Sequence, residues 1–335
     1  MESLYKIGIT HGDINGIGYE VIIKALADTK MMEVCTPIVY GLAKVATFHR
    51  KAINLGDFSF QFIKDADQAV NKKPNLINLQ DTEVKIELGN STTIAGNLAE
   101  LSLRAATKDL KNNKINAIVT APINKENIQS EKFKFSGHTE YFSNEFSSSN
   151  SLMMMVDDLL KVAFVSNHTP VKKVVAEITT QKIVDKLTIL HQSLIQDFLC
   201  TNPTIAVLAL NPHAGDNGLL GKEEQEIIIP AIQQATDKRM NVFGPFPADG
   251  FFASGKYKKF SAVLAMYHDQ GMIPFKLLAG ETGVNYTAGL PIVRTSPAHG
   301  TAYDIAGKNV AIAQSMRNAI YLAVDILRNR NNSKK

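Results

Sequence analysis

The chain has 335 residues, 45% of them hydrophobic, which exceeds the usual size of one compact domain and favours two lobes. Its 36 lysines and arginines against 32 acidic residues give a formal charge of +4 without a long basic block, which argues against nucleic acid as a partner. No apolar stretch reaches the roughly 18–20 residues of a membrane-spanning helix, so no membrane partner is expected. The two cysteines lie outside any CxxC motif and no signal-peptide core follows Met1, so the sequence predicts a soluble, cytoplasmic protein.

Short apolar runs alternate with helical patterns along the whole chain. Strands are predicted at 7–10, 38–40, 76–79, 117–120, 152–156, 163–165, 204–210 and 262–266, and helices at 19–27, 96–111, 180–199, 223–237 and 310–327. This alternation is typical of α/β units with a largely parallel sheet. The last helix should return the chain to its first lobe. We therefore expect a discontinuous first lobe of residues 1–135 and 280–335, a second lobe of residues 136–279, and a disordered tail at 329–335.

Three of the predicted strands are each followed within a few residues by a histidine. His168 follows the strand at 163–165, His213 the strand at 204–210, and His268 the strand at 262–266. Ligands on open α/β sheets bind beyond the carboxyl ends of the strands, so the three imidazoles are expected to converge. Three neutral imidazoles can bind a divalent metal and leave coordination positions open for substrate or water. The pattern predicts a metal-assisted enzyme, although each histidine alone could be a solvated turn residue.

Three further motifs could bind a ligand, and each also has an ordinary structural explanation. The glycines of Thr10–Gly18 match neither a dinucleotide fingerprint nor a P-loop, and a simple strand-to-helix turn would explain them. In the segment Ser136–Glu140, His138 and Thr139 could bind a phosphate, or the segment could cap a helix. Arg294, followed by two hydroxyl side chains, could hold a carboxylate or phosphate, or it could be a solvated surface arginine.

Taken together, these motifs resemble the 4-hydroxythreonine-4-phosphate dehydrogenase family of pyridoxal phosphate biosynthesis. The resemblance runs from Gly8 to about Ser315 and rests on Gly12-Asp13 with Gly16-Ile17-Gly18, Gly137-His138-Thr139-Glu140, Asn211-Pro212-His213-Ala214-Gly215, Gly244-Pro245 with Pro247-Ala248-Asp249, Tyr267-His268-Asp269-Gln270-Gly271, and Gly289-Leu290-Pro291 with Arg294-Thr295-Ser296. It implies an α/β fold of two lobes like that of isocitrate and isopropylmalate dehydrogenases. Two α/β/α lobes would surround a central cleft, and neither would be a Rossmann domain.

The resemblance also implies an activity and a set of site residues. The activity is the oxidation of 4-phosphooxy-L-threonine with NAD or NADP and one divalent metal, followed by decarboxylation to 3-amino-2-oxopropyl phosphate. The metal, which could be zinc, cobalt, nickel or magnesium, would be held by His168, His213 and His268. The phosphorylated substrate would be bound by His138, Thr139, Lys276, Asn285 and Arg294, the general base would be Lys276 or Asp269, and the cofactor would contact Gly283, His299 and Asp304. Members of the family are homodimers with a shared active site, so a second copy is the expected partner, bound through the metal-binding second lobe.

Two departures from the family pattern leave the substrate open. The family usually has Asp-Pro-Ala-Gly-Ile-Gly-Pro-Glu, whereas this chain has Asp13-Ile14-Asn15-Gly16-Ile17-Gly18-Tyr19-Glu20. After the first metal histidine, Thr169-Pro170-Val171 replaces the usual aliphatic residue, proline and leucine. A dehydrogenase of phospho-threonate or phospho-erythronate would use the same chemistry. A phosphate acyltransferase would leave the three histidines without a role, and an exported binding protein would need the signal segment that the sequence lacks.

Overall fold

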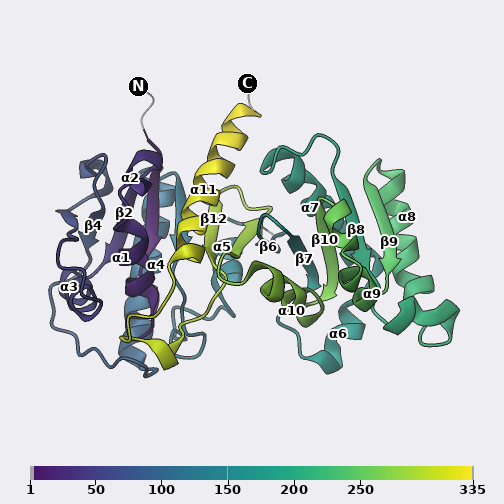
Figure 1. The fold of residues 1–335 in the computed structure, drawn as a ribbon, viewed down its shortest axis with the longest axis horizontal. Helices are drawn as coiled ribbons and strands as arrows, with labels where there is room; N and C mark the ends of the chain where they lie inside the picture. The colour runs from purple at the N-terminus through teal and green to yellow at the C-terminus, as the bar shows by residue number, and fades with distance from the viewer. Residues whose placement is uncertain (1–3, 149, 334–335) are drawn as a thin grey trace. The chain divides into compact units, whose positions relative to one another are not determined.

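The computed structural model describes residues 4–148 and 150–333, and its chain forms two compact units (Figure 1). Unit 1 consists of Met1–Tyr141 and Ile292–Arg328, and unit 2 of Phe142–Pro291 and Asn329–Lys335. Both boundaries lie later in the chain than the predicted 135/136 and 279/280. The second one moves because β11 (Val284–Ala288) pairs antiparallel with β6 (Leu152–Val156), which ties β11 to unit 2.

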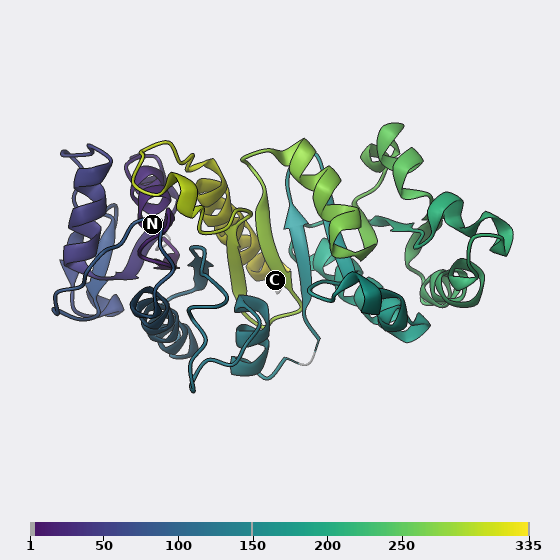
Figure 2. The same cartoon turned by 90° about the horizontal axis from the view of Figure 1, so that it is seen from below.

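The six strands of unit 1 form a parallel sheet in the order β3-β4-β2-β1-β5-β12. Helix α4 (Thr93–Lys111) packs on one face of this sheet, and α1 (Gly18–Leu26) and α3 (Ala43–Ala52) pack on the other (Figure 2). The central strands are buried on both faces, as expected for parallel strands covered by helices on each side. The strands are β1 (Lys6–Thr10), β2 (Thr36–Gly41), β3 (Gln61–Ile63), β4 (Asn75–Asn78), β5 (Ala117–Thr120) and β12 (Val293–Pro297), and the remaining helices are α2 (Met31–Val34), η1 (Ala66–Gln68) and η5 (Tyr303–Ile305).

The six strands of unit 2 run in the order β11-β6-β7-β10-β8-β9. The pairs β11/β6 and β6/β7 are antiparallel, and the pairs β7/β10, β10/β8 and β8/β9 are parallel. Helix α10 (His268–Ala279) covers one face of the sheet, and α7 (Thr180–Gln196) lies on the other (Figure 2). The other elements are β7 (Lys161–Ser166), β8 (Thr204–Leu208), β9 (Asn241–Phe246), β10 (Ala262–Tyr267), α6 (Val171–Glu177), η2 (Pro212–Gly218), the π-helix η3 (Glu224–Ile228), α8 (Ile229–Asp237), α9 (Ala248–Ala253) and η4 (Lys256–Lys259); α5 (His138–Glu145) and α11 (Gln314–Asn332) run across the unit boundaries.

The predicted α/β class with a largely parallel sheet is confirmed. All eight predicted strands are present, but β3, β9, β11 and β12 were not predicted. Strand β12 was missed because its sequence, VRTSP, contains an arginine and a proline, yet every one of its residues is buried. Within the described residues, no helix is both long enough and apolar enough to cross a membrane.

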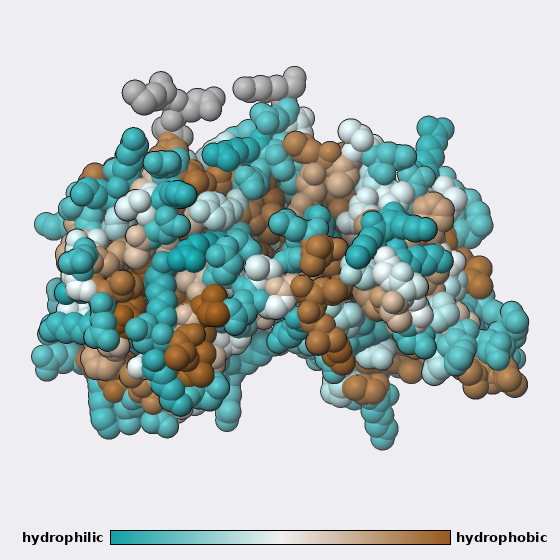
Figure 3. Space-filling model, viewed as in Figure 1, coloured by the Kyte–Doolittle hydropathy of each residue, from teal (hydrophilic) through white to brown (hydrophobic). Residues whose placement is uncertain are grey.

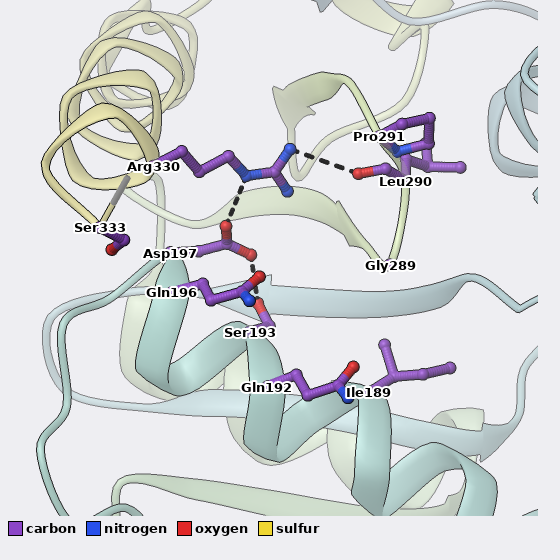
Figure 4. Close-up of a pocket in the computed structure, with 10 residues that line it drawn as sticks. All are labelled: Ile189, Gln192, Ser193, Gln196, Asp197, Gly289, Leu290, Pro291, Arg330 and Ser333. Carbon is purple, nitrogen blue, oxygen red and sulfur yellow. Dashed lines mark hydrogen bonds and ion pairs between the residues drawn. The ribbon is translucent and has the colours of Figure 1, made fainter. Parts of the chain in front are cut away.

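The C-terminal helix α11 continues to Asn332, so the predicted disorder of the tail is wrong for residues 329–333, and residues 334 and 335 lie outside the described part of the chain. Arg330 Nε donates to the Asp197 carboxylate at 2.7 Å (Figure 4). Arg330 Nη2 donates to the Tyr286 hydroxyl at 3.0 Å. Asp197 is only 3% exposed. The ion pair of Arg330 with the buried Asp197 therefore orders the end of the chain. Because Asp197 is distant in the sequence, no local pattern indicates this order.

Candidate functional site

The three histidines lie beyond three adjacent strands of unit 2. Strand β10 lies between β7 and β8 and is parallel to both. His168 follows β7, His268 is the first residue of α10 directly after β10, and His213 lies in η2 after β8. Because the carboxyl ends of parallel strands meet at one edge of a sheet, all three side chains belong to the same edge of unit 2.

Two of the histidines lie next to each other. The ring centroids of His168 and His268 are 6.1 Å apart, and both rings line a pocket of about 220 Å³. His268 Nδ1 lies 2.7 Å from an Asp269 carboxylate oxygen. A carboxylate that accepts the Nδ1 proton fixes the orientation of the imidazole and leaves Nε2 available as a metal ligand.

His213 does not form a group of possible metal ligands with His168 and His268. His213 is exposed, in a loop where it and Ala214 have left-handed backbone angles with φ of 53° and 54°. Among residues 4–148 and 150–333, no group of three or more His, Cys, Asp or Glu side chains is arranged to hold a metal ion. Within the described residues, one chain therefore brings two of the three predicted metal-binding imidazoles together, those of His168 and His268.

Gln270 connects the segments that carry His268 and His213. Its Oε1 accepts a hydrogen bond from the Met266 amide at 2.8 Å, and its Nε2 donates to the Ala209 carbonyl at 2.6 Å. Ala209 directly follows β8, and Gln270 lies in the first turn of α10. The side chain therefore ties the ends of β10 and β8 together at the edge of the sheet.

Unit 1 contains a buried cluster around Arg294. This residue is 2% exposed, and its Nη2 donates to Thr120 Oγ1 at 2.7 Å and to Ser296 Oγ at 3.0 Å. Burial lowers the pKa of Arg294 to about 9, and the nearby Glu140 carboxylate raises it. The two hydroxyl partners are neutral, so the nearby Glu140 carboxylate favours the charged form of this buried guanidinium.

The His138 imidazole completes this cluster. Its Nδ1 lies 3.2 Å from Arg294 Nη2 and accepts a hydrogen bond from it, so the ring proton belongs on Nε2. Desolvation, together with the charges of Arg294 and Lys125, keeps the pKa of His138 well below its ordinary value. Within the described residues, Nε2 is buried and has no hydrogen-bond partner. His138 and Thr139 begin helix α5, whose amino end favours an anion.

The loop after β12, which carries His299 and Asp304, is held by the glycine-rich loop near the N-terminus. The Tyr303 hydroxyl and Asn127 Nδ2 each donate to Asp13 Oδ2 at 2.8 Å. The Thr301 carbonyl accepts from the Ile17 amide at 3.0 Å, and a Cβ on Gly16 would lie 2.6 Å from that carbonyl oxygen. Close approach of two backbone segments therefore explains Gly16 without a ligand.

The remaining predicted site residues lie in unit 2. Lys276 is exposed on α10, Asn285 is half-buried on β11, and Gly283 precedes that strand. These three residues, Asp269 and the histidine edge belong to unit 2, whereas unit 1 contains His138, Thr139, Arg294, His299 and Asp304. The supporting contacts of Asp13, Thr120 and Gln270 leave no local pattern in the sequence, because each joins residues that are distant along the chain.

Comparison with known proteins shows similarity over nearly the whole chain. Residues 33–323 match the family model described as pyridoxal phosphate biosynthetic protein PdxA. A 4-hydroxythreonine-4-phosphate dehydrogenase of Bacteroides thetaiotaomicron is 52% identical over 334 residues, covering 99% of this chain and 92% of the relative. A protein of Oceanobacillus iheyensis with the provisional name D-threonate 4-phosphate dehydrogenase is 39% identical over 324 residues, covering 96% and 97%. The crystal structure of a 4-hydroxythreonine-4-phosphate dehydrogenase from Klebsiella pneumoniae has a TM-score of 0.79 and 34% identity, covering 97% of this chain and 100% of the other.

Proposed function

This chain belongs to the family of the pyridoxal phosphate biosynthetic protein PdxA, and we propose that it oxidises 4-phosphooxy-L-threonine with NAD and decarboxylates the product to 3-amino-2-oxopropyl phosphate. In the first step the carbon bearing the hydroxyl gives up a hydride and the hydroxyl gives up a proton. In the second step the resulting β-keto acid loses its carboxylate as carbon dioxide. Besides family membership, one observation supports the proposal. The buried guanidinium of Arg294 lies beside the neutral imidazole of His138.

The Arg294 cluster is suited to the substrate phosphate. A guanidinium that is 2% exposed has lost most of its hydration, and a bound dianion would offset that cost with charge-assisted hydrogen bonds. His138 would donate its Nε2 proton to the same phosphate, since its low pKa keeps the ring neutral at neutral pH. Thr139, in the first turn of α5, would add a hydroxyl donor at the helix amino end.

The histidine edge fits a divalent metal in part. His168 and His268 supply two imidazoles with ring centroids 6.1 Å apart, and Asp269 orients one of them. A bound cation would lower the pKa of the substrate hydroxyl and stabilise the negative charge that develops during decarboxylation. Imidazole ligands favour zinc, cobalt or nickel over magnesium. We assign His213 as the third ligand of this set.

A second copy of the chain would complete the site. Three large apolar side chains of unit 2 are exposed near the histidine edge: Ile273 is 60% exposed, Leu277 81% and Leu219 79%. Figure 3 shows hydrophobic side chains exposed over α10. Apolar surface of this kind marks an interaction site, and α10 itself begins at His268. A homodimer formed through this surface would cover it and bring ligands of both chains to one metal.

The remaining roles follow from what each side chain already contacts. Asp269 is engaged with His268 Nδ1, so it orients the imidazole, and Lys276 on the same helix is the better candidate for the proton acceptor. The loop of His299 and Asp304, fixed by Asp13, would bind NAD or NADP together with Gly283. NAD would accept the hydride.

The test is an assay of the purified protein with NAD, one of several divalent metals and either 4-phosphooxy-L-threonine or D-threonate 4-phosphate. The second substrate is included because the Oceanobacillus relative is named for it. We expect NADH and an aminoketone phosphate from the first substrate, with at least roughly tenfold higher kcat/KM than for the second, because a site built to bind an amine rejects an analogue that lacks it. The reverse preference would assign the threonate reaction. The absence of NADH with both substrates and every metal would refute the dehydrogenase.

A further inference from the structure

The loop that carries His213 has a strained backbone. His213, Ala214, Asp216 and Asn217 all have φ between 42° and 54°, and Gly215 between them has φ of 76°. For residues with a side chain, this left-handed conformation costs roughly 1–2 kcal/mol each. Four such residues in one short loop persist only if surrounding contacts enforce the conformation.

The side chain that enforces it is the carboxylate of Glu224, which is 2% exposed. Its Oε1 accepts hydrogen bonds from the Leu210 amide at 2.8 Å and the Asn211 amide at 2.7 Å. Its Oε2 accepts a third from Asn211 Nδ2 at 2.9 Å. These donors lie directly before Pro212, where the left-handed loop begins, so one carboxylate fixes the point at which the chain leaves β8.

The loop also packs directly onto this carboxylate. A Cβ added to Gly215 would lie 2.5 Å from Glu224 Oε2, so only glycine allows the approach. The Leu220 amide donates to the Gly215 carbonyl at 3.0 Å and closes the loop. Removing the carboxylate would therefore take away both the hydrogen-bond acceptors and the surface on which the loop rests.

Glu224 occupies a special backbone position of its own. It begins the π-helix η3 (Glu224–Ile228), a wider turn than the α-helix that follows, and such turns are frequent at functional sites. Within this turn the Ile227 carbonyl accepts a hydrogen bond from Thr180 Oγ1 at 3.2 Å. Thr180 begins α7, so the π-turn is tied to a long helix that packs on the sheet of unit 2.

We propose that Glu224 is a positioning residue that holds the left-handed loop and thereby presents His213 to the metal. The inference rests on the proposed function, because it takes His213 as a metal ligand. Without the carboxylate, the half-buried amides of Leu210 and Asn211 would lose their partner, and the loop would relax towards an ordinary conformation. His213 would then lose the position from which it would reach a metal held by His168 and His268 of a second copy.

The experiment compares Glu224→Ala, Glu224→Gln and the control Glu226→Ala with the full-length wild type. Glu226 lies in the same π-helix, but its side chain is exposed. Co²⁺ alone is titrated into each protein and followed by its visible absorption, after circular dichroism has shown which variants are folded. We expect Glu224→Ala to weaken Co²⁺ binding roughly 10–100-fold, the usual effect of losing a residue that orients a ligand. Glu224→Gln should lose less, since its Oε1 can still accept from both amides, and Glu226→Ala should match the wild type.

A folded Glu224→Ala variant that binds Co²⁺ as tightly as the wild type would overturn the proposal. Should Glu224→Ala fail to fold, Glu224→Gln with wild-type affinity would overturn it instead. A wild type that binds no Co²⁺ would refute the metal role in the proposed function, and amide hydrogen exchange would then decide the positioning role. Faster exchange of the Leu210 and Asn211 amides in the Glu224 variants, but not in Glu226→Ala, would support it. Unchanged exchange would contradict it.

Discussion

The Arg294 cluster of unit 1 and the histidine edge of unit 2 are held in place in different ways. In unit 1, Arg294 is buried and hydrogen-bonded to hydroxyls of its own sheet, so the proposed anion site is held in place by the packing of the core. In unit 2, His168 and His213 are exposed and lie outside the strands, and the loop of His213 follows a segment that is hydrogen-bonded to the Glu224 carboxylate. We therefore expect the Arg294 cluster to stay folded when its charge is removed. The loop that carries His213 should instead change its conformation when one supporting side chain is removed.

The largest effect is expected from Arg294→Met, which keeps most of the side-chain length but removes the cation. Leaving a substrate phosphate without its buried partner costs about 2–5 kcal/mol, so kcat/KM should fall on the order of 10³-fold. Stability should change little, because the substitution removes the desolvation cost of the buried cation together with its attraction to the Glu140 carboxylate. Steady-state kinetics and urea unfolding measure the two quantities.

A surface arginine provides the control for this variant. Arg104 pairs with Glu100 and its side chain is 39% exposed, so Arg104→Met should leave kcat/KM unchanged. Equal losses of activity in the two variants would show that Arg294 acts through general stability. A large fall in the stability of Arg294→Met would contradict the proposal that the Arg294 cluster serves to bind the substrate phosphate.

A smaller effect is expected on acid stability, from the two buried histidines His11 and His49 of unit 1. Tyr19 stacks between His11 and His49, with ring centroids 5.1 Å and 5.2 Å away. Burial lowers the pKa of each imidazole to about 4, against the hydrogen bonds to the Gly12 and Ile14 carbonyls, which raise it. The unfolded chain therefore binds more protons between pH 4 and 6.5, and stability that is complete above about pH 6.5 is lost as the pH falls towards 4.

Each histidine should contribute a loss of about 2 kcal/mol between pH 7 and pH 5. His49→Gln can keep the hydrogen bond to the Ile14 carbonyl but does not titrate, so its acid loss should be smaller by that amount. Urea unfolding at the two pH values checks this. The same acid loss in wild type and variant would show that His49 is not the cause.

The smallest effect is expected from Asp269→Asn. The asparagine can still contact His268, but it accepts the Nδ1 proton less strongly, so metal affinity should fall on the order of 10-fold. Because the Asp269 side chain is 66% exposed, unfolding in urea should be unchanged. Co²⁺ titration gives the affinity, and a change in stability without a change in affinity would contradict the orienting role.

The sequence predicted those features that leave a local pattern. The apolar runs before His168, His213 and His268 correspond to β7, β8 and β10, and their common edge follows from parallel pairing. The helix at Thr180 also begins at the predicted residue. Resemblance to a known family supplied the roles of residues such as Arg294 and Asn285, and these roles remain proposals.

Features that depend on long-range contacts could not be predicted. Strand β12 contains the buried Arg294, which is stabilised by hydrogen bonds to Thr120 on the neighbouring strand, to Ser296 and to His138. The last turns of α11 are ordered by the pair of Arg330 and Asp197. The left-handed loop at His213 depends on Glu224, and no periodicity in the sequence signals a carboxylate that supports a loop before it in the chain.

The most direct test of the central claim is a crystal structure of the protein grown with Co²⁺, with the metal located by its anomalous scattering. The account predicts a peak about 2.1 Å from imidazole nitrogens of His168, His213 and His268, drawn from one chain or shared between two copies. A protein that turns over 4-phosphooxy-L-threonine while its cobalt lies away from these three rings would contradict it.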